Sequence, residues 1–243
     1  MLNHLISKAD LHLHTTASDG AATAPEMLAH VAQSPDMRLI AITDHDSIAG
    51  ARQAAQLAPQ FGVEVIVGEE VSTAQGHLLA LFIDTVIPAG RPAAETIAAI
   101  HAQGGLAIAP HPFDRSVPSL GRAGLDQPGW DFDAIEGFNA GVVWWQRGSN
   151  RTAQRAATRM GLPLVGGSDA HALAATGLGY TLFPGTSATD LYRAIQAGQT
   201  GWGGQYWTLG QYAEITYRLI RQHSLLGALG MAAADAGLIA RHQ

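Results

Sequence analysis

The sequence predicts a single α/β domain whose parallel strands fold into a barrel. Short apolar runs alternate almost throughout with helical patterns, and this alternation predicts parallel β/α units. The length of 243 residues lies within the range of one α/β barrel. Polar residues that can bind metal recur where the predicted strands end, and folds of this class place their active sites at those ends. We therefore expect one domain over residues 1–243, with its site at one rim of the barrel.

Composition limits the classes of function. Apolar residues make up 47% of the chain and charged residues 14%, which suits closely packed helices over a buried sheet. The formal net charge of −6 provides no basic field for nonspecific nucleic-acid binding. The chain has no cysteine, which excludes disulfides and thiolate catalysis. Neither a signal peptide nor an apolar run that could span a bilayer is recognisable, and we expect a cytoplasmic protein.

The first half of the chain shows clear strand and helix signals. Alternation around Leu11 and Leu13 predicts the first strand. Thr23 is expected to cap the first helix and Ser47 the second, which runs through residue 57. The other expected strands lie at 38–42, 63–67, 71–83 and 106–109, and a third helix is expected at 93–103.

The second half continues the alternation after an irregular loop at 113–130 that we leave unassigned. Strands are expected at 134–138, 162–165 and 179–183, and helices at 149–160, with an exposed basic face, and from Ser187 to Gly198. Residues 208–241 are expected to form a helical tail with a break near Gly227 or Gly230. Its apolar residues suit packing on the barrel or on a second subunit; they are Tyr206, Trp207, Tyr212, Ile215, Leu219, Leu225 and Leu226.

His12 and His14 are the first candidate metal ligands. Residues two apart on a strand face the same way, so the two imidazoles would project together while Leu11 and Leu13 face the other side. Asp19 follows a turn rich in Ser, Asp and Gly and would return a carboxylate to the same region. A single His-x-His pair is weak evidence, but later strand ends repeat this chemistry.

The complete candidate set combines imidazoles and carboxylates without sulfur, which favours Zn, Mn or Fe. Nine ligands are too many for one ion and suit two or three. Three carboxylates against three divalent cations leave a centre of about +3, which attracts anions. Clustered metals also activate water, so phosphate-ester hydrolysis is the leading reaction class. The nine candidates are His12, His14, Asp19, His45, Glu70, His77, His111, Asp169 and His171.

Seven motifs occur in an order that resembles the polymerase and histidinol phosphatase (PHP) superfamily, over roughly residues 8–184. They are Asp-Leu-His-x-His at 10–14, Ser-Asp-Gly at 18–20, Thr-Asp-His at 43–45, Gly-x-Glu-Val-Ser at 68–72, Gly-His at 76–77, Pro-His-Pro at 110–112 and Gly-Ser-Asp-Ala-His at 167–171. The resemblance implies a distorted seven-stranded barrel, (β/α)7, at 8–184, followed by a C-terminal helical segment at 185–243.

The resemblance also implies a trinuclear metal site. His12, His14, Asp169 and Glu70 would bind the first metal, and Glu70 would bridge to a second metal held by His77 and His111. Asp19, His45 and His171 would hold the third. Glu70, Asp169 and His171 are the expected catalytic residues.

The implied reaction is attack of a metal-bridging hydroxide on a small phosphorylated metabolite, such as a nucleotide, histidinol or sugar phosphate. An amidohydrolase-like reaction at a C–N or C–O bond and a noncatalytic metal-binding module are the alternatives. We expect no stable nucleic-acid partner and no membrane partner. The C-terminal helix is a candidate surface for forming a homo-oligomer, and the sequence does not decide the oligomeric state.

Residues beside the ligands allow more than one interpretation. Only one of the adjacent Glu69 and Glu70 can face the site, and the Gly-x-Glu-Val-Ser register selects Glu70. Asp10 and Asp44 suit either a hydrogen bond to a ligand imidazole or a turn. The remaining histidines receive no role; they are His4, His30, His101, His223 and His242.

Substrate recognition is assigned to residues that follow strand ends. Arg115, Arg122 and Arg147 are candidates for a bidentate phosphate clamp, with Arg115, Arg147 and Asn139 as the selected substrate-binding set. A solvated loop arginine is the alternative for each. Trp144 and Trp145 would either stack on a base or sugar or, as we favour, pack against a neighbouring loop.

Overall fold

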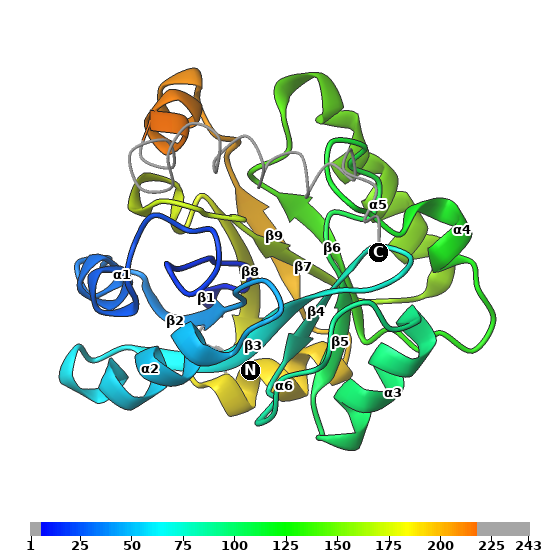
Figure 1. Ribbon diagram of the computed structural model, residues 1–243, viewed down its shortest axis with the longest axis horizontal. Helices are drawn as coiled ribbons and strands as arrows, with labels where there is room; N and C mark the ends of the chain where they lie inside the picture. Colours follow the sequence, from blue (N-terminus) through cyan, green and yellow to red (C-terminus); the bar gives the residue numbers. More distant parts are fainter. Residues whose placement is uncertain (1–5, 218–243) are drawn as a thin grey trace, which may run out of the picture.

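A strongly curved sheet forms the centre of the computed structural model, which describes residues 6–217 (Figure 1). Its nine strands are ordered β7-β6-β5-β4-β3-β2-β1-β8-β9. The two ends of this order approach each other, because β7 also contacts β8 and β9. The sheet is therefore nearly closed, and the expectation of an α/β barrel is confirmed. Within residues 6–217, no helix is long and apolar enough to cross a membrane.

Most predicted elements are present with small shifts of their ends. Two strand predictions are wrong: the first strand ends at Asp10, before Leu11 and Leu13, and the strand expected at 71–83 is interrupted at 73–76, where the chain reverses direction. The strands are β1 (Ile6–Asp10), β2 (Met37–Ile42), β3 (Glu64–Ser72), β4 (His77–Leu81), β5 (Leu106–Ala109), β6 (Ala134–Asn139), β7 (Leu164–Gly167), β8 (Gly179–Pro184) and β9 (Gly201–Gly204). The helices are α1 (Ala24–Val31), α2 (Ala49–Leu57), α3 (Ala93–Ala102), α4 (Gly121–Leu125), α5 (Gly148–Met160) and α6 (Ala188–Gln196).

The prediction of a strictly parallel β/α repeat is wrong for two strands. β4 is antiparallel to both β3 and β5, and β8 is antiparallel to β1 and β9. Only residues 73–76 join β3 to β4, and so short a connection cannot carry the chain back for a parallel pairing. β9 was not predicted, because its Gly-Trp-Gly-Gly sequence lacks the β-branched residues that signal a strand. Among residues 6–217 the sheet thus has nine strands where seven were expected.

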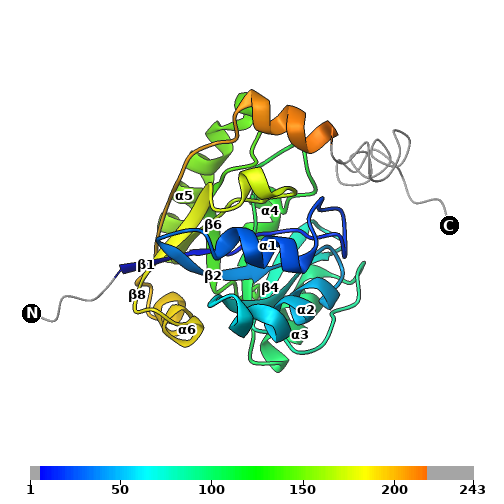
Figure 2. The same ribbon diagram turned by 90° about the vertical axis from the view of Figure 1, so that its left-hand side faces the viewer.

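The interior of the barrel is filled by small and aliphatic side chains from most strands, including Ala9, Leu39, Ile66 and Ile108. Leu191 of α6 joins this cluster, and α6 closes the barrel on the side opposite residues 209–217 (Figures 1 and 2). Two further apolar clusters lie outside the sheet, one beneath α1 and α2 and the other beneath α3 and α5. The polar site therefore lies at the end of the barrel that α6 does not cover.

The helix ends show which capping predictions hold. Thr23 caps α1, with Glu26 completing a reciprocal capping box, and Ser187 and Asp190 do the same for α6. The prediction for Ser47 is wrong, because Ile48 occupies the cap position of α2. The Ser47 hydroxyl instead accepts a hydrogen bond from the amide of Ala49.

The described part of the tail packs on the barrel. Residues 209–217 are helical, and Trp207 and Ile215 are buried in the same apolar cluster as α1 and α2. Tyr206 and Tyr212 pack against that cluster as well. Leu219, Leu225, Leu226 and the expected break near Gly227 or Gly230 lie outside the described residues. Packing on a second subunit stays a prediction.

Candidate metal centre

Segments that leave the sheet at one end bring all nine predicted metal ligands together. β1 ends at Asp10, and the chain continues to His12 and His14 in an extended form, bridged at Leu13 to Ala170. The two imidazole centroids lie 5.2 Å apart. The expectation that Leu11 and Leu13 share a face is wrong, because Leu11 packs inside the barrel and Leu13 in the cluster beneath α1. His77 begins the antiparallel strand β4, which places it at the same rim as the ends of the parallel strands.

Glu70 lies at the centre of the cluster. Its Oε1 is 2.8 Å from His77 Nδ1 and 3.0 Å from His111 Nε2. Its Oε2 is 3.0 Å from His12 Nε2 and 3.2 Å from His14 Nε2. The neighbouring Glu69 faces the other side, where its Oε2 accepts a hydrogen bond from the amide of Ile87. Glu70, rather than Glu69, thus lies among the imidazoles.

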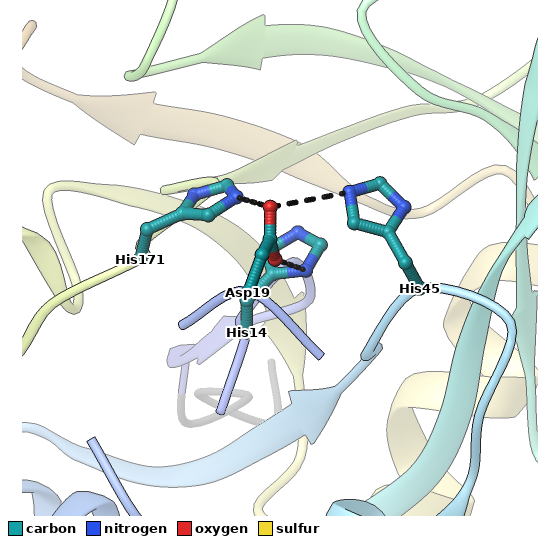
Figure 3. A group of neighbouring side chains, drawn as sticks. All are labelled: His14, Asp19, His45 and His171. Carbon is teal, nitrogen blue, oxygen red and sulfur yellow. Dashed lines mark hydrogen bonds and ion pairs between the residues drawn. The ribbon is translucent and has the colours of Figure 1, made fainter. Parts of the chain in front are cut away.

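Two aspartates bring the remaining histidines into the cluster. Asp19 lies among His14, His45 and His171, with its Oδ2 3.1 Å from His171 Nε2 and 3.8 Å from His45 Nε2 (Figure 3). Asp169 Oδ1 lies 3.4 Å from His14 Nε2 and 3.5 Å from His12 Nε2. These carboxylates and Glu70 form a continuous chain of contacts from one edge of the centre to the other.

The donor set suits divalent cations. Among the described residues, four overlapping groups have ligand atoms within 4.8 Å of one another. The groups are His14, Asp19, His45 and His171; His12, His111 and Asp169; His12, His14 and Glu70; and His45, Glu70 and His77. Both ring nitrogens of His14 are buried and make no hydrogen bond, although carboxylate oxygens of Glu70, Asp169 and Asp19 lie 3.2–3.5 Å away, an arrangement that suits cations shared between these groups. Shared ligands fit several ions close together.

The grouping by distance differs in part from the assignment that the resemblance implies. His14 belongs both to the group with His12 and Glu70, as assigned, and to the group around Asp19. His77 and His111, expected on one metal, fall into different groups. The trinuclear assignment of individual ligands therefore stays a prediction.

Coupling between the charges dominates the protonation of the centre. Burial opposes the shift, but the surrounding imidazoles hold the pKa values of Glu70 and Asp169 well below the usual range. Burial likewise opposes the rise for His12 and His14, yet their carboxylate neighbours hold both pKa values well above the ordinary value. In the metal-free protein these raised pKa values favour the protonated forms of His12 and His14, so a cation that binds there competes with protons.

Asp10 and Asp44, which lie just before ligand histidines in the sequence, accept hydrogen bonds mainly from main-chain amides and not from imidazole rings. Asp10 accepts hydrogen bonds from the amides of Ser168 at 2.9 Å, Gly177 at 2.8 Å and His12 at 3.3 Å. Burial raises the pKa of Asp10 to about 6. Asp44 accepts from the amide and hydroxyl of Thr15, both at 2.7 Å. Only the bond from the His12 amide is local, and the bonds from Ser168, Gly177 and Thr15 come from 29 or more positions away, so these two aspartates mainly hold distant segments together rather than close a turn or orient an imidazole.

Two buried residues at the centre were missed by the sequence analysis. Glu136 of β6 is 1% exposed, and its Oε1 lies 3.1 Å from His12 Nδ1. Trp207, 7% exposed, donates its indole N–H to the carbonyl of Ser168 at 3.1 Å. A lone acidic residue inside the otherwise apolar strand 134–138 was the available signal for Glu136. Nothing in the sequence links residue 207 to the loop at 168–171.

The proposed substrate-binding residues lie in different surroundings. Asn139 is buried, and its side-chain amide donates to Glu136 Oε2 at 3.0 Å and Asp169 Oδ2 at 3.1 Å, so it holds protein groups. Arg115 is exposed. Arg147 is exposed too and lies over the ring of Tyr206, 4.3 Å from its centroid. Arg122 forms an exposed ion pair with Asp126.

Trp144 and Trp145 follow Asn139 on the same loop. Each is 64% exposed, and the two rings contact each other edge to face, with centroids 5.4 Å apart. The favoured prediction, that they pack against a neighbouring loop, does not describe side chains this exposed.

Comparison with known proteins supports the motif analysis. The model of the PHP domain matches residues 10–136, and the model described as PHP-associated matches residues 147–200. Together the two models cover every predicted ligand, whereas Trp207 lies outside both.

Relatives and solved structures agree with this match. An uncharacterized protein of Methanocaldococcus jannaschii is 39% identical over 143 residues, which are 55% of this chain and 82% of that protein. A 3′,5′-nucleoside bisphosphate phosphatase of Chromobacterium violaceum is 38% identical over 88 residues, 35% of this chain but only 30% of the relative. A two-domain protein from Bacteroides vulgatus, described as containing a predicted PHP-like metal-dependent phosphoesterase, superposes with a TM-score of 0.68 at 19% identity, over 83% of this chain and 65% of that chain. At that identity the superposition shows the shared fold alone.

Proposed function

The chain belongs to the PHP domain family, and from this premise we propose that it is a metal-dependent phosphoesterase acting on a small phosphorylated metabolite. The observation that carries the proposal is the cluster itself, in which nine imidazole and carboxylate ligands from segments far apart in sequence converge without a missing position. A noncatalytic copy has no need to retain the full set.

The chemistry of the ligands supports a phosphate ester as substrate. His12, His14, Asp19, His45, Glu70, His77, His111, Asp169 and His171 would hold two to three divalent ions, with Zn, Mn and Fe as candidates. Bound ions supply a nucleophile at neutral pH and neutralise the oxygens of a phosphoryl group. Only three of the nine ligands carry negative charge, so the loaded centre keeps a positive potential that attracts an anion.

The protein's own groups have separable tasks. Glu70 lies within 3.2 Å of four imidazoles and fixes their relative positions. The backbone carbonyl of Asp169 accepts a hydrogen bond from His171 Nδ1 at 2.9 Å, which leaves His171 Nε2 facing Asp19. Arg115 and Arg147 are exposed and would bind the phosphate or the group attached to it.

The substrate class is a nucleotide, histidinol or sugar phosphate. The similarity to a bisphosphate phosphatase supports a nucleotide, although the match covers less than a third of that relative. The exposed Trp144 and Trp145 also favour a base, since an aromatic pair offers a stacking surface.

Phosphate release from a panel of phosphomonoesters, nucleoside bisphosphates and cyclic phosphodiesters tests the proposal. The protein is first stripped of metal and then restored with Mn, Zn or Fe. We expect metal-dependent turnover that Glu70→Ala loses and that the matched control Glu95→Ala, an exposed glutamate of α3, retains.

The opposing outcomes are distinct. Turnover of amides instead of phosphate esters would replace the proposal with an amidohydrolase-like activity. Bound metal without turnover of any substrate would identify a metal-binding module.

A further inference from the structure

Glu136 is a buried carboxylate that none of the predicted motifs includes. It lies on β6, facing the metal centre, and is 1% exposed. The backbone approaches closely on that side: a Cβ at Gly167 would lie 2.7 Å from Glu136 Oε1 and 2.5 Å from His12 Cβ. Burying a carboxylate is costly unless its oxygens are satisfied, so its partners indicate its role.

The hydrogen-bond partners of Glu136 all belong to, or contact, one group of candidate metal ligands. Oε1 lies 3.1 Å from His12 Nδ1. Oε2 accepts from the backbone amide of His111 at 2.7 Å and from Asn139 Nδ2 at 3.0 Å. The same Asn139 nitrogen lies 3.1 Å from Asp169 Oδ2. His12, His111 and Asp169 form one of the four candidate metal groups, and Glu136 contacts two of them directly and the third through Asn139.

Two of these three ligands have unfavourable backbone conformations. The φ angles are 27° for His111 and 54° for Asp169, in the left-handed region that non-glycine residues rarely adopt. Such conformations are unfavourable and persist where the surroundings hold them. The bonds from His111 N and Asn139 Nδ2 are among the interactions that do so.

The hydrogen-bond pattern also fixes the orientation and the tautomer of His12. His12 Nε2 faces Glu70 Oε2 at 3.0 Å and Asp169 Oδ1 at 3.5 Å, so Nε2 is the nitrogen directed at the metal ligands. A nitrogen binds metal only through its lone pair, and the ring proton must then be on Nδ1. Glu136 Oε1 is an acceptor at the right place for that proton.

We propose that Glu136 is the positioning residue of the metal site formed by His12, His111 and Asp169, acting by holding the proton of His12 on Nδ1. The proposal rests on the metal centre and not on the phosphoesterase reaction. It assigns Glu136 no contact with substrate.

Glu136→Gln tests the proposal with almost no change of shape. Two N–H donors, from His111 and Asn139, converge on Oε2, so the glutamine must place its carbonyl oxygen there. Its NH2 group then faces His12 Nδ1 and forces this nitrogen to accept. The proton of a neutral His12 moves to Nε2, where it blocks the lone pair directed at the metal.

A closely matched control lies on the other end of the same strand. Asp133 directly precedes β6, and its Oδ2 accepts from the backbone amide of Ala107 at 2.7 Å and lies 2.9 Å from His101 Nε2. It therefore also contacts an imidazole and a main-chain amide, yet it touches none of the candidate ligands. Asp133→Asn repeats the chemical change away from the metal centre.

Zinc binding is measured by chelator competition and by counting ions per chain, independently of activity. We expect Glu136→Gln to bind one ion about 10- to 100-fold more weakly, the range typical of carboxylates that orient ligand histidines. Its zinc content should fall by one ion per chain, while Asp133→Asn should match the wild type. Unchanged affinity and zinc content in a folded Glu136→Gln protein would overturn the proposal.

A second measurement on the wild-type protein remains decisive even if the variant does not fold. In the zinc-loaded, ¹⁵N-histidine-labelled protein, two-bond correlations report which nitrogen of His12 carries a proton, and His12→Asn identifies the signal. We expect a protonated Nδ1 and a metal-bound Nε2. A proton on Nε2, or zinc on Nδ1, would contradict the proposal.

Discussion

The interior and the rim of the candidate site are built in opposite ways. In the interior, Glu70 alone lies within 3.2 Å of four imidazoles and is 1% exposed. At the rim, Arg115 and Arg147 are exposed, and Trp144 and Trp145 are each 64% exposed. Side chains in the interior have one arrangement that satisfies them, whereas those at the rim can change rotamer at little cost. The interior is thus suited to hold metal ions and the rim to adapt to a substrate.

The largest effect is expected in the interior, from Asp169→Asn. Asparagine tolerates the left-handed backbone at this position, so the change removes the charge and leaves the conformation. We expect metal-dependent phosphate release to fall by about a thousandfold, since a catalytic metal contributes several kcal/mol to the transition state. Steady-state kinetics with the exposed Asp36→Asn as control measures this. Activity within tenfold of wild type would show that the interior is not the reaction centre.

The second prediction concerns how the stability of the protein depends on pH, which should differ between the metal-free and the metal-loaded forms. The folded-state pKa values of His12, His14, His111 and His171 are raised, because carboxylates outweigh the effect of burial. Their stabilising contribution is therefore complete below the unfolded pKa of about 6.5 and is lost as pH rises through the folded values.

The melting temperature of the metal-free protein should therefore fall as pH rises above about 6.5. The gain from added zinc should grow over the same range, because the ligands must lose protons to bind. Thermal scans in chelator and in zinc measure both slopes. A metal-free protein that gains stability toward alkaline pH would contradict the raised pKa values of the four histidines.

The third prediction tests whether the C-terminal segment supports the interior. Trp207→Phe removes the donor to the buried carbonyl of Ser168 and keeps an aromatic ring. An unsatisfied buried acceptor costs about 1–3 kcal/mol of unfolding free energy. Urea unfolding should show a loss in this range for Trp207→Phe and less for Trp202→Phe, whose indole is 36% exposed. Equal losses for both variants would remove any special role of Trp207.

The smallest structural effect is expected at the rim. Arg115→Ala and Arg147→Ala should leave the metal content unchanged. The melting temperature should stay the same for Arg115→Ala, whose side chain is exposed, and fall slightly for Arg147→Ala, which loses its contact with the Tyr206 ring. KM for a phosphorylated substrate should rise by about tenfold if one charge-assisted hydrogen bond is lost. Unchanged kinetics in both variants would eliminate the proposed phosphate clamp.

The sequence predicted the interior better than the rim, and the reason is physical. His45, His111 and Asp169 follow buried strands, and the carboxyl ends of these strands meet at one end of the barrel whatever conformation the loops adopt. His77 begins a strand, but because β4 is antiparallel to β3, its first residue lies at the same end of the barrel. The set of nine could therefore be named before its geometry was known. Rim side chains such as Arg147 and Trp144 depend on loop conformation, which no periodic pattern encodes.

The residues that were missed share a different property. Glu136 acts through partners that are far away in sequence, since His12 lies 124 positions before it. Trp207 reaches Ser168 from a segment beyond both family matches. The glycine-rich β9 is recognised only when β8 is in place to pair with it. Each of these features is set by tertiary contacts, and local sequence carries little trace of them.

The most direct test of the central claim is a zinc or manganese titration of the metal-free protein, with bound ions and phosphate release measured in the same samples. We predict that activity reaches its maximum at two to three ions per chain and that chelation abolishes it reversibly. Phosphate release that persists without metal, or a chain that binds no ion at the nine-ligand cluster, would contradict the claim.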